Sequence, residues 1–599
     1  MKYFLTFLMI LSASTNYALT NITTPNVSGT WSLSGSPYIV QVPITVPAAL
    51  SLTIQPGVEV RFMAATKLDV NGKLIAKGTS SSPIVFSAND TIGWSNQSVT
   101  TGGWGGIHIF QYQGSGVDSS KMEFCTIKDC KYGYSTYIAD MCPFLASRKL
   151  KLINCNFTHN TCGTGMNTSG TVITLSTQSA TDTIELDGCD VSENTSVFGV
   201  LRFENYQGGY TYIHRTRVHH NHECSSLWGS WFNALIENNE VDHNDMINDN
   251  APIKMSIGTA TIRFNKVHHN HCHQLAAIGC RSGKIDIDNN LICNNEQLDG
   301  NCGATGGGGG IHLAHNEGGA NFADTYYRVR NNVIVNNYSA YGGGGIYVYH
   351  AKAEIMNNTI VNNSTALGSG NALLILDAMS EVKVKNNLFK GNSIPNWADS
   401  LKILSIYSCN TLLFDNNYIP GQFYQSVSGS YAQLLGDTSH NVIGNSPMLT
   451  APTANSLVTT DATNANFNLQ ILSPCVDKGD TVGASCLPID YLSNNRIMGP
   501  KIDIGAFEVI KSGESIFEQN QNKTSFHFYP NPALDLVQVS TILNKGVLQL
   551  FNVEGRILKS IDFHQSNFHF SVQDITPGIY FIRLTDGKQS TKTEKIMVD

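Results

Sequence analysis

A short phrase built around Asn recurs along most of this 599-residue chain. Asn332-Val-Ile-Val-Asn-Asn337 is one copy and Asn358-Thr-Ile-Val-Asn-Asn363 is another. Each copy opens with Asn or a small residue, has an apolar residue at its centre and closes with Asn. Ten copies and a truncated eleventh have their apolar centres at Ile127, Phe157, Val191, Val218, Val241, Val267, Ile292, Ile334, Ile360, Phe389 and Ile419. A unit that recurs every 23 to 42 residues predicts a solenoid, in which each unit packs against its neighbours.

The local pattern inside each unit is that of a β-strand. The run Tyr327-Arg-Val-Arg-Asn-Asn-Val-Ile-Val335 alternates and is rich in β-branched residues, and no unit has the period of an amphipathic helix. Short strands punctuated by Asn and Gly fit a parallel β-helix, whose successive turns pair at about 4.8 Å. We therefore expect an all-β fold.

The Asn that closes each phrase has a structural role in this interpretation. In a regular β-helix these residues lie above one another at one bend, where side-chain amides can hydrogen-bond from turn to turn and tolerate left-handed backbone geometry. The expected column contains Asn160, Asn194, Asn221, Asn244, Asn270, Asn295, Asn337, Asn363 and Asn392.

With these repeats the chain resembles the right-handed parallel β-helix proteins of the pectate-lyase-like superfamily. The resemblance implies a right-handed parallel β-helix over residues 107–449. The phrase Thr53-Ile-Gln-Pro-Gly-Val-Glu-Val-Arg-Phe62 resembles the entry coils of secreted bacterial β-helix proteins, so residues 19–106 are expected to form an N-terminal cap and the first coils. This fold carries lyases, hydrolases, adhesins and inert spikes alike, so it does not select an activity.

Residues 1–18 have the pattern of a secretory signal peptide. A Lys near the start precedes the apolar run Phe4-Leu-Thr-Phe-Leu-Met-Ile-Leu11, and small residues follow it. The run is too short to cross a bilayer, and no later stretch approaches about 20 apolar residues, so we expect no transmembrane segment in the mature chain.

Charge and cysteine content restrict the partners and the chemistry. Charged residues make up only 14% of the chain, its net charge is −8 and it has no basic stripe, so we do not expect a nucleic acid partner. The 14 Cys of an exported chain can form disulfides. Cys125, Cys155 and Cys189 each precede an apolar centre by two residues, so they form either a stack of small buried side chains or disulfides between adjacent turns. Cys475 and Cys486 are close enough in sequence to close a loop.

Charged residues and His concentrate in the coils from Val191 to Val267. Nine of the 18 His lie between His214 and His273. Strand alternation places the residues on either side of each apolar centre on the outer face. Along successive coils the residue before the centre is Asp190, Arg217, Glu240 and then Lys266, and the residue after it is Ser192, His219, Asp242 and then His268. A further set lies one position later, where the strand ends and the side-chain direction is not predicted: His159, His220, His243 and His269.

These coils support a functional and a structural interpretation. Imidazoles that flank a carboxylate can bind a divalent metal or provide a general base, so the candidate catalytic residues are His219, Asp242 and His268. The candidate substrate-binding residues are Arg217 and Lys266, together with Trp228 and Trp231, whose rings could stack on sugars. In the structural interpretation, opposite charges on neighbouring strands stabilise one another and the His form a polar ladder like the Asn column.

Comparison with enzymes of the superfamily leaves the activity open. Polygalacturonase-type hydrolases use an Asn-Thr-Asp triplet and an adjacent Asp pair, and this chain has neither. Pectate-lyase-like enzymes use an Arg or Lys base beside calcium-binding acids, and the nearest candidates are Arg217 and Lys266. Calcium is therefore the cofactor to expect if the chain is a lyase. A hydrolase pair could come from Asp242, Glu240, Asp245 or Glu223, but the spacing selects no pair.

The repeat stops near residue 450. Leu472-Ser-Pro-Cys-Val-Asp-Lys-Gly479 and Asp503-Ile-Gly-Ala-Phe-Glu508 resemble the closing segment of bacterial surface β-helix proteins that is often described as a choice-of-anchor domain. We expect residues 450–510 to form a C-terminal cap. Residues 511–525 are polar and lack periodicity, which is typical of a linker.

The last segment, residues 526–599, contains alternating strands and tight turns that predict a small β-sandwich. Its phrases Tyr529-Pro-Asn-Pro532, Leu548-Gln-Leu-Phe-Asn-Val-Glu-Gly555 and Ile575-Thr-Pro-Gly-Ile-Tyr-Phe-Ile-Arg-Leu584 resemble the type A C-terminal sorting domain of the type IX secretion system. The resemblance implies a protein of the Bacteroidota that the type IX secretion machinery exports, either secreted or held at the cell surface. The alternative is a generic carbohydrate-binding sandwich.

Two functions follow from these observations. The first is an exported cell-surface or secreted β-helix protein that binds polysaccharide or another surface ligand without turnover. The second is a polysaccharide lyase or glycoside hydrolase that acts through the His- and Asp-rich coils 191–292. An enzyme requires a groove in which acids and bases converge, whereas a binding protein requires only a flat or aromatic-lined face.

Overall fold

The computed structural model describes residues 19–510 and 526–598 apart from internal gaps, the longest of which are 111–119, 133–142, 163–170, 393–402 and 428–439. The expected signal peptide and the expected linker lie outside the described residues. The chain divides into two compact units, residues 1–510 and residues 511–599.

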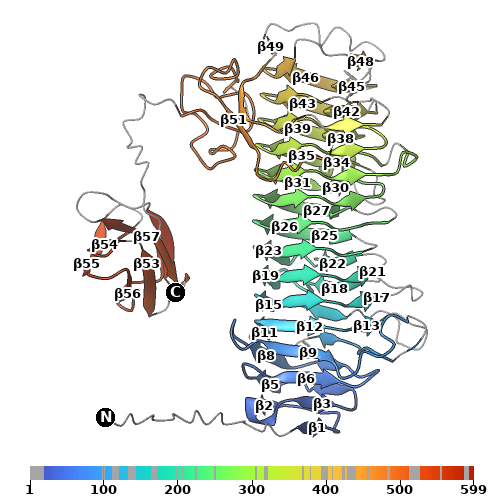
Figure 1. Ribbon diagram of the computed structural model, residues 1–599, viewed down its shortest axis with the longest axis vertical. Helices are drawn as coiled ribbons and strands as arrows, with labels where there is room; N and C mark the ends of the chain where they lie inside the picture. Colours follow the sequence, from blue (N-terminus) through green and yellow to red (C-terminus); the bar gives the residue numbers. More distant parts are fainter. Residues whose placement is uncertain are drawn as a thin grey trace, which may run out of the picture. The chain divides into compact units, whose positions relative to one another are not determined.

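The first unit is a right-handed parallel β-helix, as the repeat predicts. Its turns stack along one axis from β1 to β49 (Figure 1). Each regular turn contributes one strand to a 16-stranded parallel sheet. This sheet consists of β1 (Thr20–Ile22), β3 (Tyr38–Val40), β6 (Glu59–Phe62), β9 (Ile84–Ala88), β12 (Cys125–Lys128), β16 (Asn156–Thr158), β20 (Asp190–Ser192), β24 (Arg217–His219), β26 (Glu240–Asp242), β28 (Lys266–His268), β32 (Leu291–Cys293), β36 (Val333–Val335), β40 (Thr359–Val361), β44 (Leu388–Lys390), β47 (Tyr418–Pro420) and β49 (Val442–Gly444).

Two further sides of each turn belong to a 26-stranded sheet, in which two rows of parallel strands run along the solenoid. One row consists of β4 (Ile44–Val46), β7 (Leu68–Val70), β10 (Ile107–Ile109), β14 (Phe144–Ser147), β18 (Thr171–Ser176), β22 (Gly199–Glu204), β25 (Ser225–Glu237), β27 (Ile253–Arg263), β30 (Ile278–Arg281), β34 (Ile311–Ala314), β38 (Ile346–Tyr349), β42 (Leu373–Leu376), β45 (Leu404–Ile406) and β48 (Gln425–Val427). The other row contains β2 (Gly29–Trp31), β5 (Ser51–Ile54), β8 (Lys73–Lys77), β11 (Ser120–Glu123), β15 (Leu150–Ile153), β19 (Thr183–Asp187), β23 (Tyr210–His214), the later halves of β25 and β27, β31 (Lys284–Asp288), β35 (Tyr326–Arg330), β39 (Lys352–Met356), β43 (Glu381–Lys385) and β46 (Thr411–Asp415). Short strands that follow the 16-stranded sheet in some turns form two small parallel sheets, one of β13 (Lys131–Tyr132), β17 (Thr161–Cys162) and β21 (Thr195–Ser196) and one of β29 (His271–Cys272), β33 (Glu296–Gln297), β37 (Tyr338–Ser339) and β41 (Ser364–Thr365).

The hydrophobic core lies inside the coil and is built from the apolar centres of the repeated phrase. The apolar centres Val191, Val218, Val241 and Val267 are fully buried and pair with one another in adjacent strands. They belong to one continuous apolar cluster that extends from Val27 to Ile419. Each turn therefore buries its centre only when its neighbours are present, as expected for a solenoid.

The closing Asn residues form the predicted ladder. The Nδ2 atom of Asn244 donates to Oδ1 of Asn270 at 2.9 Å, and Asn270 donates to Asn295 at 3.0 Å. The left-handed backbone, however, belongs to the residue before the ladder Asn, such as His243 with φ 51° and Asn294 with φ 55°. The opening position of the phrase forms a second ladder that was not predicted, consisting of Asn239, Asn265, Asn290, Asn332, Asn358, Asn387 and Asn417.

Cys125, Cys155 and Cys189 are free thiols. Cys125, Cys155 and Cys189 are buried in one column, and the Sγ atom of Cys155 lies 3.4 Å from the carbonyl oxygen of Met122 in the preceding turn. This confirms a stack of small buried side chains, and burial raises the pKa of Cys155. Cys475 and Cys486 are also free, so the predicted loop-closing disulfide is wrong.

Residues 450–510, here called the covering segment, fold back along the outside of the 16-stranded sheet (Figure 1). The Nδ2 atom of Asn294 donates to the carbonyl oxygens of Val458 and Thr460, both at 2.8 Å, and Asn331 donates to Ile489 at 2.6 Å. The outward side chains of the strands beneath are apolar and share a core with this segment: Leu291, Cys293, Val333, Val335, Val361 and Leu388 pack with Ala462, Phe467 and Phe507. The antiparallel pair of β50 (Leu449–Ala451) and β51 (Asn466–Leu469) lies at the beginning of this segment, with β50 starting one residue before it. The expected cap thus lies along the side of the later coils.

The second unit is a small all-β domain. Two antiparallel sheets, β52-β53-β56 and β55-β54-β57-β58, enclose one core that includes Val537, Leu548 and Ile582. Its strands are β52 (Phe526–Tyr529), β53 (Leu536–Thr541), β54 (Gly546–Phe551), β55 (Ile557–Phe563), β56 (Asn567–Ser571), β57 (Gly578–Thr585) and β58 (Glu594–Val598). Within the described parts of both units, no helix has the length and hydrophobicity needed to span a lipid bilayer.

Candidate functional site

The outward side of β20, β24, β26 and β28, here called the charged face, lies immediately before the apolar strands that the covering segment buries. The register is the predicted one. Asp190, Arg217, Glu240 and Lys266 pair in adjacent strands, and so do Ser192, His219, Asp242 and His268. The sequence therefore places both columns of this face correctly.

The charges are paired diagonally between the two columns. The guanidinium of Arg217 reaches Asp242 in the next turn with two hydrogen bonds, Nε to Oδ1 at 2.9 Å and Nη2 to Oδ2 at 2.8 Å. Burial alone would raise the pKa of Asp242, but hydrogen bonds from Arg217 and His243 hold this pKa below its ordinary value. The same contact raises the pKa of Arg217. Asp242 is therefore an ionised carboxylate with both oxygens hydrogen-bonded, which makes it a weak general base.

The two candidate catalytic His residues are each bound to a different acid. Nε2 of His219 lies 2.9 Å from Oδ2 of Asp190, and Nε2 of His268 lies 3.0 Å from Oε1 of Glu240. The structure therefore brings Asp242 and His268 together but pairs His219 elsewhere. The prediction of a surface site needs correction, because Asp242 is fully buried and His268 is 6% exposed.

The set of His whose direction could not be predicted turns outward. His220, His243 and His269, here called the outer His column, have φ angles of 51°, 51° and 52°. Successive rings stack with centroids 5.1 Å apart and interplanar angles of 3° and 2°. Nε2 of His269 lies 3.8 Å from Oδ1 of Asp461, which belongs to the covering segment. Local sequence could not reveal this contact, because the two residues are far apart in the chain.

The side-chain ligand atoms of Glu240, Asp242 and His268 lie within 4.8 Å of one another. We tested this group against the calcium that the superfamily resemblance implies. Calcium takes six to eight oxygen ligands, whereas both oxygens of Asp242 are already bound by Arg217 and His243. The third member is an imidazole, which calcium does not favour. The group therefore does not fit calcium.

The aromatic candidates lie on another side of the coil. Trp228 belongs to β25 in the 26-stranded sheet, where Arg202 and Lys254 lie over its ring at 4.5 and 5.3 Å from the centroid. Trp231, in the same strand, is 44% exposed and has a φ of 50°. Lys266 is exposed on β28 of the 16-stranded sheet. Of the further carboxylates, Asp245 is exposed, and Glu223 lies outside the described residues.

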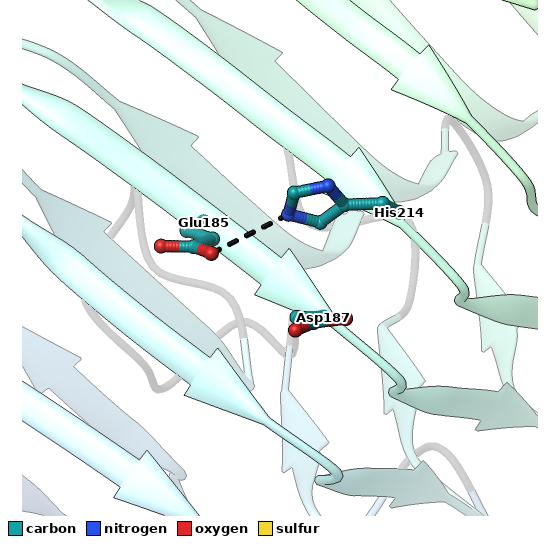
Figure 2. A group of neighbouring side chains, drawn as sticks. All are labelled: Glu185, Asp187 and His214. Carbon is teal, nitrogen blue, oxygen red and sulfur yellow. Dashed lines mark ion pairs between the residues drawn. The ribbon is translucent and has the colours of Figure 1, made fainter. Parts of the chain in front are cut away.

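A second group of acids and His, which sequence reasoning missed, lies on β19 and β23. Figure 2 shows His214 beside Glu185 and Asp187, and Nε2 of His214 is 3.4 Å from Oε1 of Glu185. The neighbouring imidazole of His214 lowers the pKa of Glu185 to about 2, and Glu185 in turn raises the pKa of His214. Lys151 and Arg215 pair with the two acids. The sequence did contain a signal for this group, because Asp187 and His214 each lie four residues before the apolar centre of their turn, Val191 and Val218.

Comparisons with known proteins identify the second unit. A family model for the secretion system C-terminal sorting domain matches residues 527–599, so the chain carries a type IX sorting domain that directs secretion to the cell surface or outside the cell. A search of the curated proteins gives no match. Among solved structures, the crystal structure of the periplasmic alginate epimerase AlgG is similar at 12% identity, over 67% of this chain and 85% of that chain, with a TM-score of 0.28.

Proposed function

We propose that this protein is a surface-binding protein of the Bacteroidota that enters export through a signal peptide at residues 1–18. After secretion, its charged face binds polysaccharide or another extended surface ligand without turning it over. The main observation behind the proposal is that the acids and bases on this face are hydrogen-bonded to one another. Asp242 is bound by Arg217, His219 by Asp190 and His268 by Glu240.

The engaged pairs favour binding over catalysis for a physical reason. A general acid or base must reach the proton that it transfers, and its pKa must match that task. A carboxylate held by a bidentate guanidinium has a lowered pKa and two occupied oxygens, so proton abstraction from a sugar would first have to break that pair. Paired charges at the regular spacing of the turns instead offer repeated polar contacts to an extended chain.

The covering segment supports the same proposal. It buries the outward side of β32, β36, β40 and β44, whereas the neighbouring charged face keeps Arg217 and Lys266 exposed. Because these cations repeat two turns apart, they suit a ligand that carries carboxylates or other acidic groups along its length.

The alternative is a polysaccharide lyase or glycoside hydrolase at the same coils. The close approach of Glu240, Asp242 and His268 is the observation that favours it. Because this group does not fit calcium, a calcium-dependent lyase is the less favoured form of the alternative.

The proposal is tested by binding of the purified full-length chain to a panel of acidic and neutral polysaccharides. Lys266→Glu is the informative variant, because Lys266 is exposed and reversal of its charge leaves the core intact. We expect at least tenfold weaker binding, about 1.4 kcal/mol, to an acidic polymer. Lys501→Glu, an exposed change on the covering segment, is the matched control and should bind as the wild type does. Equal affinity of both variants for every bound polymer would move binding away from the charged face.

A further inference from the structure

The hydrogen bonds of the outer His column determine which ring nitrogen carries the proton. Nδ1 of His243 lies 2.8 Å from Oδ2 of Asp242. A carboxylate accepts hydrogen bonds, so neutral His243 holds its proton on Nδ1 and keeps the lone pair of Nε2 free of a proton.

The other two members of the column reach the same state through a second imidazole. In neutral His268, Nε2–H donates to Glu240 at 3.0 Å, so Nδ1 of His268 accepts, and Nδ1–H of His269 lies 3.0 Å from it. His269 is thereby left with an unprotonated Nε2.

His220 repeats this relay one turn before His243. Nε2–H of His219 donates to Asp190 at 2.9 Å, and Nδ1 of His219 accepts from Nδ1–H of His220 at 2.8 Å. Three different sets of partners thus impose one tautomer on all three outer rings. His220 and His269 reach this tautomer through a second imidazole, and His243 reaches it through a carboxylate. All three outer rings therefore carry the proton on Nδ1.

The three Nε2 lone pairs belong to rings that are stacked in parallel and accessible. Successive centroids are 5.1 Å apart, and the His243 side chain is 48% exposed. At one end of the column Asp461 adds a carboxylate oxygen, 3.8 Å from Nε2 of His269. The side chains of His243 and His269, from two successive turns, and that of Asp461, from the covering segment, therefore lie next to one another.

We propose that this column is a binding site for a divalent transition-metal ion such as zinc, held by Nε2 of His243, Nε2 of His269 and the carboxylate of Asp461. Imidazoles that donate their other nitrogen to a carboxylate are the usual ligands of such ions. Two imidazoles with one carboxylate suit zinc, copper or nickel better than calcium or magnesium. The proposal does not depend on polysaccharide binding by the charged face.

The two rings must move to form the site. Two nitrogens bound tetrahedrally to one zinc ion at about 2.0–2.1 Å each lie about 3.3 Å apart, whereas the ring centroids of His243 and His269 are 5.1 Å apart, so the rings must tilt out of their parallel arrangement and approach one another. The His243 side chain is 48% exposed, so it has room for this rotation.

The test is titration of zinc into the full-length chain, produced without a polyhistidine tag and treated with a chelator, by isothermal calorimetry. The informative variants are His243→Asn and His269→Asn. Asn preserves the backbone, because Asn294, Asn336 and Asn362 occupy the same position of later turns with φ angles of 55°, 54° and 56°. We expect each variant to bind zinc at least tenfold more weakly while still unfolding in a cooperative thermal transition in the absence of metal.

The matched control is His159→Asn. His159 has the same left-handed backbone and a similar Nδ1 contact, 2.7 Å from Asp129, but Glu193 separates it from the outer His column. This variant should retain wild-type affinity. Equal zinc affinity in the wild type, His243→Asn and His269→Asn, or no zinc uptake by the wild type, would overturn the proposal.

The relay itself is tested by Glu240→Gln. Glu240 is not a proposed ligand, yet it orients His268, which orients His269. Loss of such a supporting carboxylate typically weakens metal binding by about 10- to 100-fold. With Cu²⁺ as the probe, electron paramagnetic resonance should show coupling to two nitrogens in the wild type and to one in His269→Asn. Unchanged coupling in His269→Asn would place the metal elsewhere.

Discussion

Replacing Asn270 with Ala should destabilise the β-helix more than any exposed substitution in the chain. The Asn270 side chain is buried and makes five hydrogen bonds. It accepts from the backbone N–H and the Nδ2 atom of Asn244, and it donates to Val241, His268 and Asn295. Because the two N–H groups of the Asn270 amide serve three acceptors, these contacts amount to about four full hydrogen bonds, or about 4 kcal/mol at about 1 kcal/mol for each.

The assay is urea unfolding of the full-length chain, combined with hydrogen exchange at the amide of Asn244, which loses its acceptor. We expect a lower unfolding midpoint and faster exchange at Asn244 than in the wild type. Asn464→Ala is the control, because the exposed Asn464 side chain makes one hydrogen bond, to Thr463 at 3.3 Å. A destabilisation of Asn270→Ala below about 1 kcal/mol, or exchange as slow as in the wild type, would refute the assigned role of the ladder.

Three further predictions concern charge, pH and thiols. Arg217→Ala should lower stability by about 2–3 kcal/mol, because it leaves Asp242 buried without its main partner, and adding Asp242→Asn should restore part of the loss in urea unfolding. The pKa of Glu185 is lowered to about 2 in the folded protein, so Glu185 stabilises the fold above pH 4.5 and this contribution is lost as the pH falls towards 2. The pKa of His214 is raised, so His214 stabilises the fold below pH 6.5 and this contribution is lost as the pH rises through its folded pKa. His214→Gln should therefore flatten the pH profile of the melting temperature between these limits, and an unchanged profile would contradict the assignment. Native alkylation followed by mass spectrometry should modify the partly exposed Cys302 and Cys486 well before Cys155, whose pKa burial raises; equal rates would argue against the buried column.

Much of the fold could be predicted because the repeat fixes both register and direction. The phrase places Val241 between Val218 and Val267, and the same alignment sets Glu240 and Asp242 on the outer face. Because successive side chains of a strand point to opposite faces, the residues on either side of a buried centre must point outward.

The ion pairs and the covering segment could not be predicted in the same way. Arg217 has two acids within reach in the next turn, and it makes hydrogen bonds to Asp242 and lies 3.8 Å from Glu240, a choice that depends on side-chain rotamers. The covered stretch did leave a signal. Its phrases change from Arg-Val-His, with one apolar residue, to Val-Ile-Val, with three, which indicates a strand that is buried on both sides.

Prolonged incubation with polysaccharide distinguishes binding at the charged face from turnover, because turnover leaves altered products. The full-length chain is mixed with each polysaccharide that it binds, with and without added calcium or zinc, and the polymer is analysed by size-exclusion chromatography and mass spectrometry. We predict unchanged chain length and no new chain ends. If the wild type and Lys501→Glu shorten the polymer but folded His219→Ala does not, the protein is an enzyme that acts at these coils.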